Sequence, residues 1–350
     1  MSSKSRIAIV FLSCVLPTFV ATRLTPALAA AGTDPWQCAG RNEGLSAERI
    51  FSLVVSDRGL WVGTEKGLFV QKEGSPFVKF PLGSLEPAVV LSLEYDRMTG
   101  DLWVGTFDGL ARVNESRVLT YDQFNSGLAN NVVYGLEMDE TTLWAATAAG
   151  LSRFDPLRGR WTIFNEKNTP MKEIWCYSIS ATPEYVYVGV WGSGILELNK
   201  QTGIWKIYRD PDGEPEVDLF KDDGPISDVT SSVHASNGEV WQSTYFGLSR
   251  YDGRHWRNFY AGSSTDLPSN FVNSVHRGLN LVWACTDRGL TSFDGKTWSR
   301  FLQGKNVYTV VFEGEDVIAG TDGGLYRGHI TALRSASERS VSTESGGDGQ

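Results

Sequence analysis

The stretch that decides the fold is a nine-residue motif at positions 102–110, which reads Leu-Trp-Val-Gly-Thr-Phe-Asp-Gly-Leu. Close copies occupy positions 60–68 and 143–151, and looser copies begin at 186, 240, 282 and 317, which makes seven. Measured at the second residue of each copy (61, 103, 144, 187, 241, 283 and 318), the steps are 42, 41, 43, 54, 42 and 35 residues. Such a period is typical of the four-stranded blades of a β-propeller.

The strands inside one unit follow from the alternation of apolar residues and the punctuation by turn residues. In the third unit they are expected at 131–136, 143–147, 151–154 and 161–164, and no stretch shows a sustained helical period. A four-stranded antiparallel meander that is apolar on both faces needs neighbours on both sides to be stable. We therefore expect an all-β protein, a seven-bladed β-propeller of four-stranded antiparallel blades.

The last unit lacks a fourth strand of its own. Fourth strands are expected in the other six units, at 78–80, 117–121, 161–164, 205–208, 256–259 and 298–301. The segment Trp36-Gln37-Cys38 carries the missing pattern at the other end of the propeller sequence. This predicts a propeller over residues 36–328 that is closed by its N-terminal strand. The Ser-, Gly- and Glu-rich residues 329–350 are expected to form a disordered tail.

The first residues have the pattern of an export signal. Lys4 and Arg6 precede an apolar run over 7–21, and Ala27-Leu28-Ala29 offers small residues to a signal peptidase. The run is interrupted by Pro17 and is short for a membrane span, which needs about 20 residues. We expect a cleaved signal peptide at 1–29, a periplasmic or secreted protein and no membrane span in the mature chain. An uncleaved anchor is the alternative.

The charge balance bears on the partners. The chain has 32 Lys plus Arg against 41 Asp plus Glu, a net charge of −9, and cleavage after Ala29 would leave 29 − 41 = −12. No basic cluster stands out, which excludes nucleic acid as a partner because phosphate binding needs concentrated positive charge. Of the four cysteines, cleavage would remove Cys14 and leave three in the mature chain: Cys38, Cys176 and Cys285. An odd number of widely spaced cysteines favours buried small side chains. A single disulfide is the alternative.

The repeat (Asn-x-Val, then Leu-Trp-x-Gly-Thr-x-x-Gly-Leu, then Phe/Tyr-Asp) resembles the two-component regulator propeller repeat of bacterial extracytoplasmic sensors. The resemblance covers nearly the whole mature chain. In those sensors the propeller continues into a further domain, a membrane span and a histidine kinase, whereas this sequence ends at Gln350 without them. The resemblance implies a stand-alone propeller of seven repeats, without a kinase module, that binds a ligand or a protein in extracytoplasmic sensing.

The topology predicts where a ligand would bind. Loops between the second and third strands share one face with the segments that enter the next blade, and this face around the channel carries the functional site of many small propellers. Residues there differ from blade to blade in size and charge, as an asymmetric ligand site requires, although solvated loop residues would also vary. The candidate ligand-binding residues are Arg49, Glu65, Lys66, Phe107, Asp108, Asn131, Trp175, Trp191, Tyr245, Phe246, Asp287, Arg288 and Asp322.

The aromatic members of this set indicate the kind of ligand. Phe107, Trp191, Tyr245 and Phe246 lie among carboxylates and amides. Flat apolar rings flanked by hydrogen-bonding groups can stack on a saccharide or receive a peptide. The expected partners are therefore a protein, a peptide or a saccharide. Packing between blades is the alternative role for these rings.

The 54-residue step marks an acidic insertion between the fourth and fifth blades. Alternating carboxylates there form a weak candidate for calcium, at Asp210, Asp212, Glu214, Glu216 and Asp218. Its glycine stands in the fourth position rather than the sixth, and no terminal Glu closes the loop, so a flexible acidic loop is favoured. We otherwise predict no metal site and no cofactor.

No sequence motif of a known catalytic machinery is present, and no residue is assigned as catalytic. A non-enzymatic binding propeller is therefore favoured. The first alternative is a lyase or hydrolase, because streptogramin-type lyases also have seven blades. It would use His234 and His276, which occupy equivalent positions in adjacent units, with Glu94 or Glu137 as a third group. The second alternative is a structural component of an envelope or extracellular complex.

Overall fold

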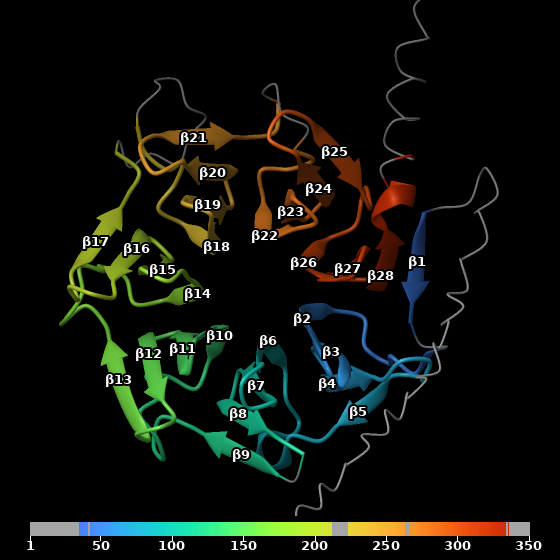
Figure 1. Cartoon of the computed structure of the whole chain (residues 1–350), viewed down its shortest axis with the longest axis horizontal. Coiled ribbons are helices and arrows are strands. Elements are labelled where there is room, and N and C mark those ends of the chain that lie inside the picture. The colour runs from blue at the N-terminus through green and yellow to red at the C-terminus, as the bar shows by residue number, and fades with distance from the viewer. Residues whose placement is uncertain are drawn as a thin grey trace, which may run out of the picture. The chain divides into compact units, whose positions relative to one another are not determined.

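The computed structural model describes residues 35–40, 43–115, 117–211, 223–262, 267–333 and 335. The expected signal peptide, residues 212–222 of the acidic insertion and the end of the expected tail lie outside these residues. The described chain forms seven four-stranded antiparallel sheets arranged in a ring (Figure 1). The predicted seven-bladed β-propeller is thereby confirmed.

We number the blades 1 to 7 in chain order. Blade 1 contains β2 (Ile50–Ser56), β3 (Gly59–Thr64), β4 (Gly67–Gln71) and β5 (Val78–Phe80). Blade 2 follows a 3-10 turn, η2 (Gly83–Leu85), and contains β6 (Val90–Asp96), β7 (Asp101–Thr106), β8 (Leu110–Val113) and β9 (Val118–Tyr121). Blade 3 contains β10 (Val133–Asp139), β11 (Thr142–Thr147), β12 (Gly150–Asp155) and β13 (Arg160–Phe164).

The second half of the ring repeats the pattern. Blade 4 contains β14 (Cys176–Ala181), β15 (Tyr185–Val190), β16 (Gly194–Asn199) and β17 (Trp205–Tyr208). Blade 5 contains β18 (Thr230–Ser236), β19 (Glu239–Thr244), β20 (Leu248–Tyr251) and β21 (Trp256–Phe259). Blade 6 contains β22 (Val272–Gly278), β23 (Leu281–Thr286), β24 (Gly289–Phe293) and β25 (Trp298–Phe301). Blade 7 contains β26 (Val307–Glu313), β27 (Asp316–Thr321), β28 (Gly324–His329) and β1 (Trp36–Ala39).

The first strand of the propeller closes the ring. β1 pairs antiparallel with β28, in a register that runs from Trp36 opposite Gly328 to Ala39 opposite Leu325. The Trp36 ring is 8% exposed and packs edge-on against Phe301 of blade 6. The predicted closure by an N-terminal strand is therefore confirmed.

The start of the expected tail differs from the prediction. Residue 329 still belongs to β28, and a helical turn begins at Ile330. Ile330 and Leu333 are buried in the same apolar cluster as Trp36. These two side chains cover the closing strand, which gives the residues after β28 a packing role where disorder was expected.

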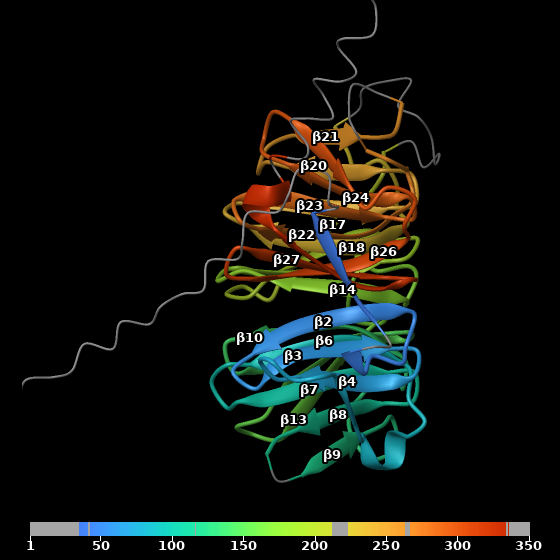
Figure 2. The same ribbon diagram turned by 90° about the vertical axis from the view of Figure 1, so that its right-hand side faces the viewer.

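The repeated tryptophan of the motif holds neighbouring blades together. Trp103 of β7 packs with Val133 and Leu143 of blade 3, and Trp144 of β11 packs with Ile179 and Val188 of blade 4. The five tryptophans at this position, Trp61, Trp103, Trp144, Trp241 and Trp283, are at most 2% exposed. Each indole ring buries a large apolar area between two neighbouring sheets. The blades therefore pack face to face, and Figure 2 shows the propeller from the side.

The small residues of the motif let the sheets approach. Gly105 of β7 lies opposite Ser92 of β6, and a Cβ atom there would come within 2.9 Å of the Val133 carbonyl oxygen of blade 3. In blade 3 the glycine is on the first strand and the larger residue on the second, because Gly135 on β10 lies opposite Ala146 on β11. The pair keeps one small partner in both blades, which preserves the spacing between sheets.

The cysteines agree only in part with the expectation. Cys176 and Cys285 are fully buried, and burial raises the pKa of both thiols to about 12. Cys38 is exposed on the outer strand β1, contrary to the expected burial, since this strand has no further blade strand outside it. All three are free thiols. Within the described ranges no helix is both long and apolar enough to cross a membrane.

Candidate ligand-binding site at the channel mouth

Every innermost strand carries the same irregularity. In each blade the register with the second strand shifts between the first and third residues of the innermost strand. A bulge of this kind leaves one residue outside the ladder and turns its side chain in a new direction. The residues concerned are Phe51, Leu91, Tyr134, Tyr177, Ser231, Asn273 and Tyr308. They stand where the innermost strands begin and therefore at the same end of the ring as the loops between second and third strands, because first and second strands are antiparallel.

Five aromatic rings at this mouth form a continuous series across blades 3 to 6, which we call the aromatic band: Tyr134, Tyr177, Trp191, Tyr245 and Phe271. Tyr134 and Tyr177 stack with ring centroids 4.5 Å apart, and Tyr177 lies 5.6 Å from Trp191. Trp191 meets Tyr245 edge-on at 5.3 Å, and Tyr245 stacks on Phe271 at 3.9 Å. Each ring touches the next, so the band is one apolar surface built from four blades.

The band is partly open to solvent. Phe271 is 39% exposed, and the other four rings are half-buried. Trp175 extends the apolar surface, because it is 50% exposed and its carbonyl oxygen accepts a hydrogen bond from the Trp191 amide at 2.9 Å. Burial raises the pKa of Tyr177 to about 12 and also raises the pKa of Tyr245. Both phenols are therefore neutral at physiological pH and present hydroxyl groups beside the rings.

Charged residues of blades 1 and 7 gather around a second aromatic pair. Phe51 and Tyr308 lie 5.4 Å apart. Burial raises the pKa of Tyr308, the charge of Asp322 adds to this, and the charge of Arg49 opposes it. These charges therefore act on the same part of the mouth.

The loop that carries Glu65 is braced by backbone contacts. The Glu65 carboxylate accepts hydrogen bonds from the amides of Glu48 and Arg49, at 3.0 and 2.9 Å. Lys66 donates from Nζ to the Ser46 carbonyl oxygen at 2.9 Å. The positions of both side chains are thus tied to the segment that enters β2.

Amide groups line the sector between the band and this charged group. Asn273 donates from Nδ2 to Asn306 Oδ1 at 2.8 Å and to the Val307 carbonyl oxygen at 2.7 Å. Asn306 in turn donates from Nδ2 to the Tyr308 hydroxyl at 3.2 Å. The mouth therefore combines an apolar band with a neighbouring polar sector.

The predicted site residues divide into groups. Trp191 and Tyr245 belong to the band with Trp175 beside them, whereas Arg49, Glu65, Lys66 and Asp322 lie in the charged sector. Phe107, Asp108 and Arg288 are exposed loop side chains, and Phe246 is half-buried outside the band. Asn131 braces its own loop, because its Oδ1 accepts a hydrogen bond from the Gln123 amide at 2.9 Å. Asp287 keeps one buried carboxylate oxygen without a hydrogen-bond partner among the described residues.

Four residues that shape the mouth were not predicted from the sequence: Tyr134, Tyr177, Phe271 and Tyr308. A signal for three of them was present. Tyr134, Tyr177 and Tyr308 share the bulge position with Phe51, so a comparison of the innermost strands would have shown an aromatic residue there in four of seven blades.

The titratable residues that a lyase or hydrolase would use lie further along the innermost strands, beyond the bulge at the channel mouth. Glu94, Glu137, His234 and His276 occupy one register position, opposite the repeated tryptophan. Burial lowers the pKa of His234 to about 4 and that of His276 to about 3, so both imidazoles are neutral at pH 7. The described residues contain no group of three His, Cys, Asp or Glu side chains that could hold a metal ion. Of the weak calcium candidates only Asp210 is described, and its amide donates to Asp228 at 2.9 Å.

Comparison with solved structures finds the same fold in other proteins. No protein-family model matches the sequence, and no curated protein matches it. The extracellular domain of BT3049, assigned to a hybrid two component system of B. thetaiotaomicron, superposes with a TM-score of 0.68 at 19% identity over 84% of this chain and 42% of that one. The extracellular domain of BT4673 from the same organism gives 0.63 at 19% identity over 81% and 38%.

A third similar structure is an enzyme. Virginiamycin B lyase from Staphylococcus aureus superposes with a TM-score of 0.63 at 12% identity over 84% of this chain and 97% of that one. The present chain spans less than half of the two-component domains but matches nearly the whole lyase. At the level of the fold, the protein is a seven-bladed propeller like those in two-component extracellular domains, and the expected resemblance is confirmed.

Proposed function

We propose that this protein is an exported, non-enzymatic propeller that binds a saccharide or a peptide segment at the channel mouth. The observation that carries the proposal is the aromatic band, in which five rings from four blades touch in series beside amide and hydroxyl groups. Flat apolar surface next to hydrogen-bonding groups suits both sugar rings and extended peptides. The similarity to extracellular domains of two-component proteins supports a sensing or binding role.

The proposal includes the cellular location. A signal peptide over residues 1–29 would deliver the propeller, residues 36–328, to the periplasm or the medium. There its ligand would be an envelope saccharide or a polypeptide partner. A purely structural contact with a larger envelope complex would use the same face without a preference for small ligands.

The test is binding to arrays of bacterial saccharides and of envelope peptides, followed by calorimetry with the strongest probe. Trp191→Ala combined with Tyr245→Ala should weaken binding at least tenfold, because each ring contributes on the order of 1 kcal/mol of stacking. The matched control is Phe124→Ala, which removes an exposed ring outside the candidate set and should keep the wild-type affinity. Unchanged binding by the double variant would refute the proposal.

A lyase or hydrolase is the second candidate, supported by the fold of virginiamycin B lyase and by the four half-buried titratable residues Glu94, Glu137, His234 and His276. Incubation with virginiamycin B, followed by mass spectrometry, tests it directly. Turnover that His276→Ala abolishes would favour the enzyme over the binding proposal.

A further inference from the structure

An ion pair between the third strand and the second strand recurs in several blades. An arginine stands opposite the motif's second residue in four blades: Arg112, Arg153, Arg250 and Arg327. In blades 2, 5 and 7 its guanidinium pairs with the acidic residue that begins the second strand, as Arg112 with Asp101 at 2.5 Å, Arg250 with Glu239, and Arg327 with Asp316 at 3.1 Å. The carboxylate compensates the charge of each arginine.

Blade 3 keeps the arginine but lacks the acid. Thr142 begins β11, at the position that Asp101, Glu239 and Asp316 hold in the other blades. Arg153 lies over the rings of Trp144 and Phe164, with its guanidinium carbon 5.6 and 5.7 Å from their centroids. Among the described residues no carboxylate lies within ion-pair distance of Arg153. Its guanidinium is therefore held by these rings and by a hydrogen bond from Nη2 to Thr162 Oγ1 at 3.5 Å, without a counter-ion.

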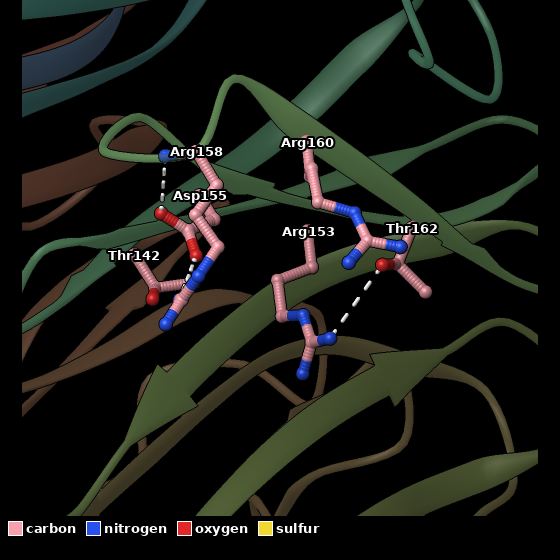
Figure 3. Close-up of a pocket in the computed structure, with 6 residues that line it drawn as sticks. All are labelled: Thr142, Arg153, Asp155, Arg158, Arg160 and Thr162. Atoms are coloured by element: carbon pink, nitrogen blue, oxygen red, sulfur yellow. Dashed lines mark hydrogen bonds and ion pairs between the residues drawn. The ribbon is translucent and has the colours of Figure 1, made fainter.

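The neighbouring residues leave a positively charged hollow here. Thr142, Arg153, Asp155, Arg158, Arg160 and Thr162 line a pocket of about 380 Å³ (Figure 3). The strand register puts Arg160 beside Asp155 and Thr162 beside Arg153, so these side chains share one face of the blade. All come from the strand ends opposite to the channel mouth described above, which makes this a separate site.

The charges in the hollow do not cancel. Arg158 donates to the Asp155 carboxylate at 2.6 Å, and this contact holds the pKa of Asp155 below its usual range. Asp155 thus neutralises one arginine, while no carboxylate of the described chain pairs with Arg153 or Arg160. Three guanidinium groups against one carboxylate leave a net charge of +2 in a protein whose own net charge is −9.

We propose that this pocket binds a tetrahedral dianion, a phosphate or sulfate group. Arginine presents planar pairs of N–H donors that match the oxygens of such groups, and the two threonine hydroxyls supply further donors. The net charge of +2 matches a dianion. The volume exceeds that of a single ion, so the group would be carried by a small organic molecule such as a phosphorylated or sulfated sugar.

The test is calorimetric titration of the full-length secreted protein at low salt with sodium sulfate, sodium phosphate and sodium acetate. Sulfate and phosphate should bind, and acetate should bind at least tenfold more weakly. Thr142→Asp should weaken sulfate binding at least tenfold, because the new carboxylate would pair with Arg153 as Asp101 pairs with Arg112. Arg160→Gln should have a similar effect.

The controls separate the site from general charge and from folding. Arg254→Gln removes the same charge from an exposed turn of blade 5 and should bind sulfate like the wild type. Sulfate should raise the melting temperature of the wild type but not of Thr142→Asp, which is expected to fold because three other blades contain that ion pair. Equal affinity in Thr142→Asp and the wild type, equal binding of acetate, or no binding at millimolar sulfate would overturn the proposal. Glucose 6-phosphate binding more tightly than inorganic phosphate would support an organic ligand.

Discussion

Glu94 and Glu137 occupy the same position on the neighbouring innermost strands β6 and β10, and each bridges to the following blade through a backbone amide. Glu94 Oε1 accepts from the Met138 amide at 3.4 Å, and Glu137 Oε1 accepts from the Ala181 amide at 2.9 Å. Burial raises the pKa of both carboxyl groups, to about 7 for Glu137 and well above its usual value for Glu94, where the charge of Glu137 contributes. These junctions therefore respond to pH.

Glu137→Gln should flatten the dependence of stability on pH. The folded state prefers the protonated carboxyl, so its stabilising contribution is complete below pH 4.5 and is lost as the pH rises through 7. The wild type should lose about 2–2.5 kcal/mol more unfolding free energy than the variant between pH 5 and 8, since one pKa unit corresponds to about 1.4 kcal/mol. Urea denaturation at both pH values measures this, with the exposed Glu184→Gln as control. Parallel pH profiles for wild type and variant would contradict the prediction.

The two half-buried histidines His234 and His276 should act in the opposite direction. Burial keeps His234 and His276 neutral by lowering their pKa values to about 4 and about 3. Because these values lie below the usual 6.5, the histidines contribute stability that is present above pH 6.5 and is lost as the pH falls toward the folded values. The NMR signals of the His276 ring should stay constant from pH 8 to 5. A titration midpoint near 6.5 would show that the imidazole is accessible and would strengthen the enzyme alternative.

Trp36→Ala should weaken the closure of the ring. Trp36 is 8% exposed, packs on Phe301 and holds the strand that completes blade 7. Removing a buried aromatic ring costs about 3–5 kcal/mol, because apolar contacts are lost and a cavity is left. Thermal denaturation should show a lower melting temperature for this variant than for the wild type. Phe124→Ala, which removes a ring that is 86% exposed, should leave the melting temperature within error.

Gly105→Ala should destabilise the junction between blades 2 and 3. A Cβ atom at Gly105 would lie 2.2 Å from Ser92 Oγ and 2.9 Å from the Val133 carbonyl oxygen. Overpacking of this kind costs about 1–3 kcal/mol. Adding Ser92→Gly should recover part of the loss, since blade 3 already combines Gly135 with Ala146 at this place. Gly40→Ala has open space around it and serves as the control; an additive double variant would disprove the size coupling.

Much of the fold could be predicted because each blade repeats the same local pattern. The motif gives the second strand, the turn and the third strand of every blade, and the missing fourth strand of the last unit pointed to Trp36. The packing of Ile330 and Leu333 could not be predicted, because Ser, Gly and Glu dominate the residues that follow and the two apolar side chains form no periodic pattern.

The candidate site could be predicted only in part. Trp191 and Tyr245 were found because loop position follows from topology. Tyr177 and Phe271 were not, because the bulge that turns a strand residue outward and the contact of rings from different blades depend on backbone geometry.

The sequence by itself determined the number of blades, their strand order and the way the ring closes, because these follow from a periodic pattern of apolar, small and turn residues. Only the tertiary structure decided which side chains act together. The aromatic band joins four blades, and Arg153 lacks a counter-ion because Thr142, on the neighbouring strand, stands where three other blades have an acidic residue. Such relationships depend on distances between residues from separate strands and blades, which a linear repeat does not specify.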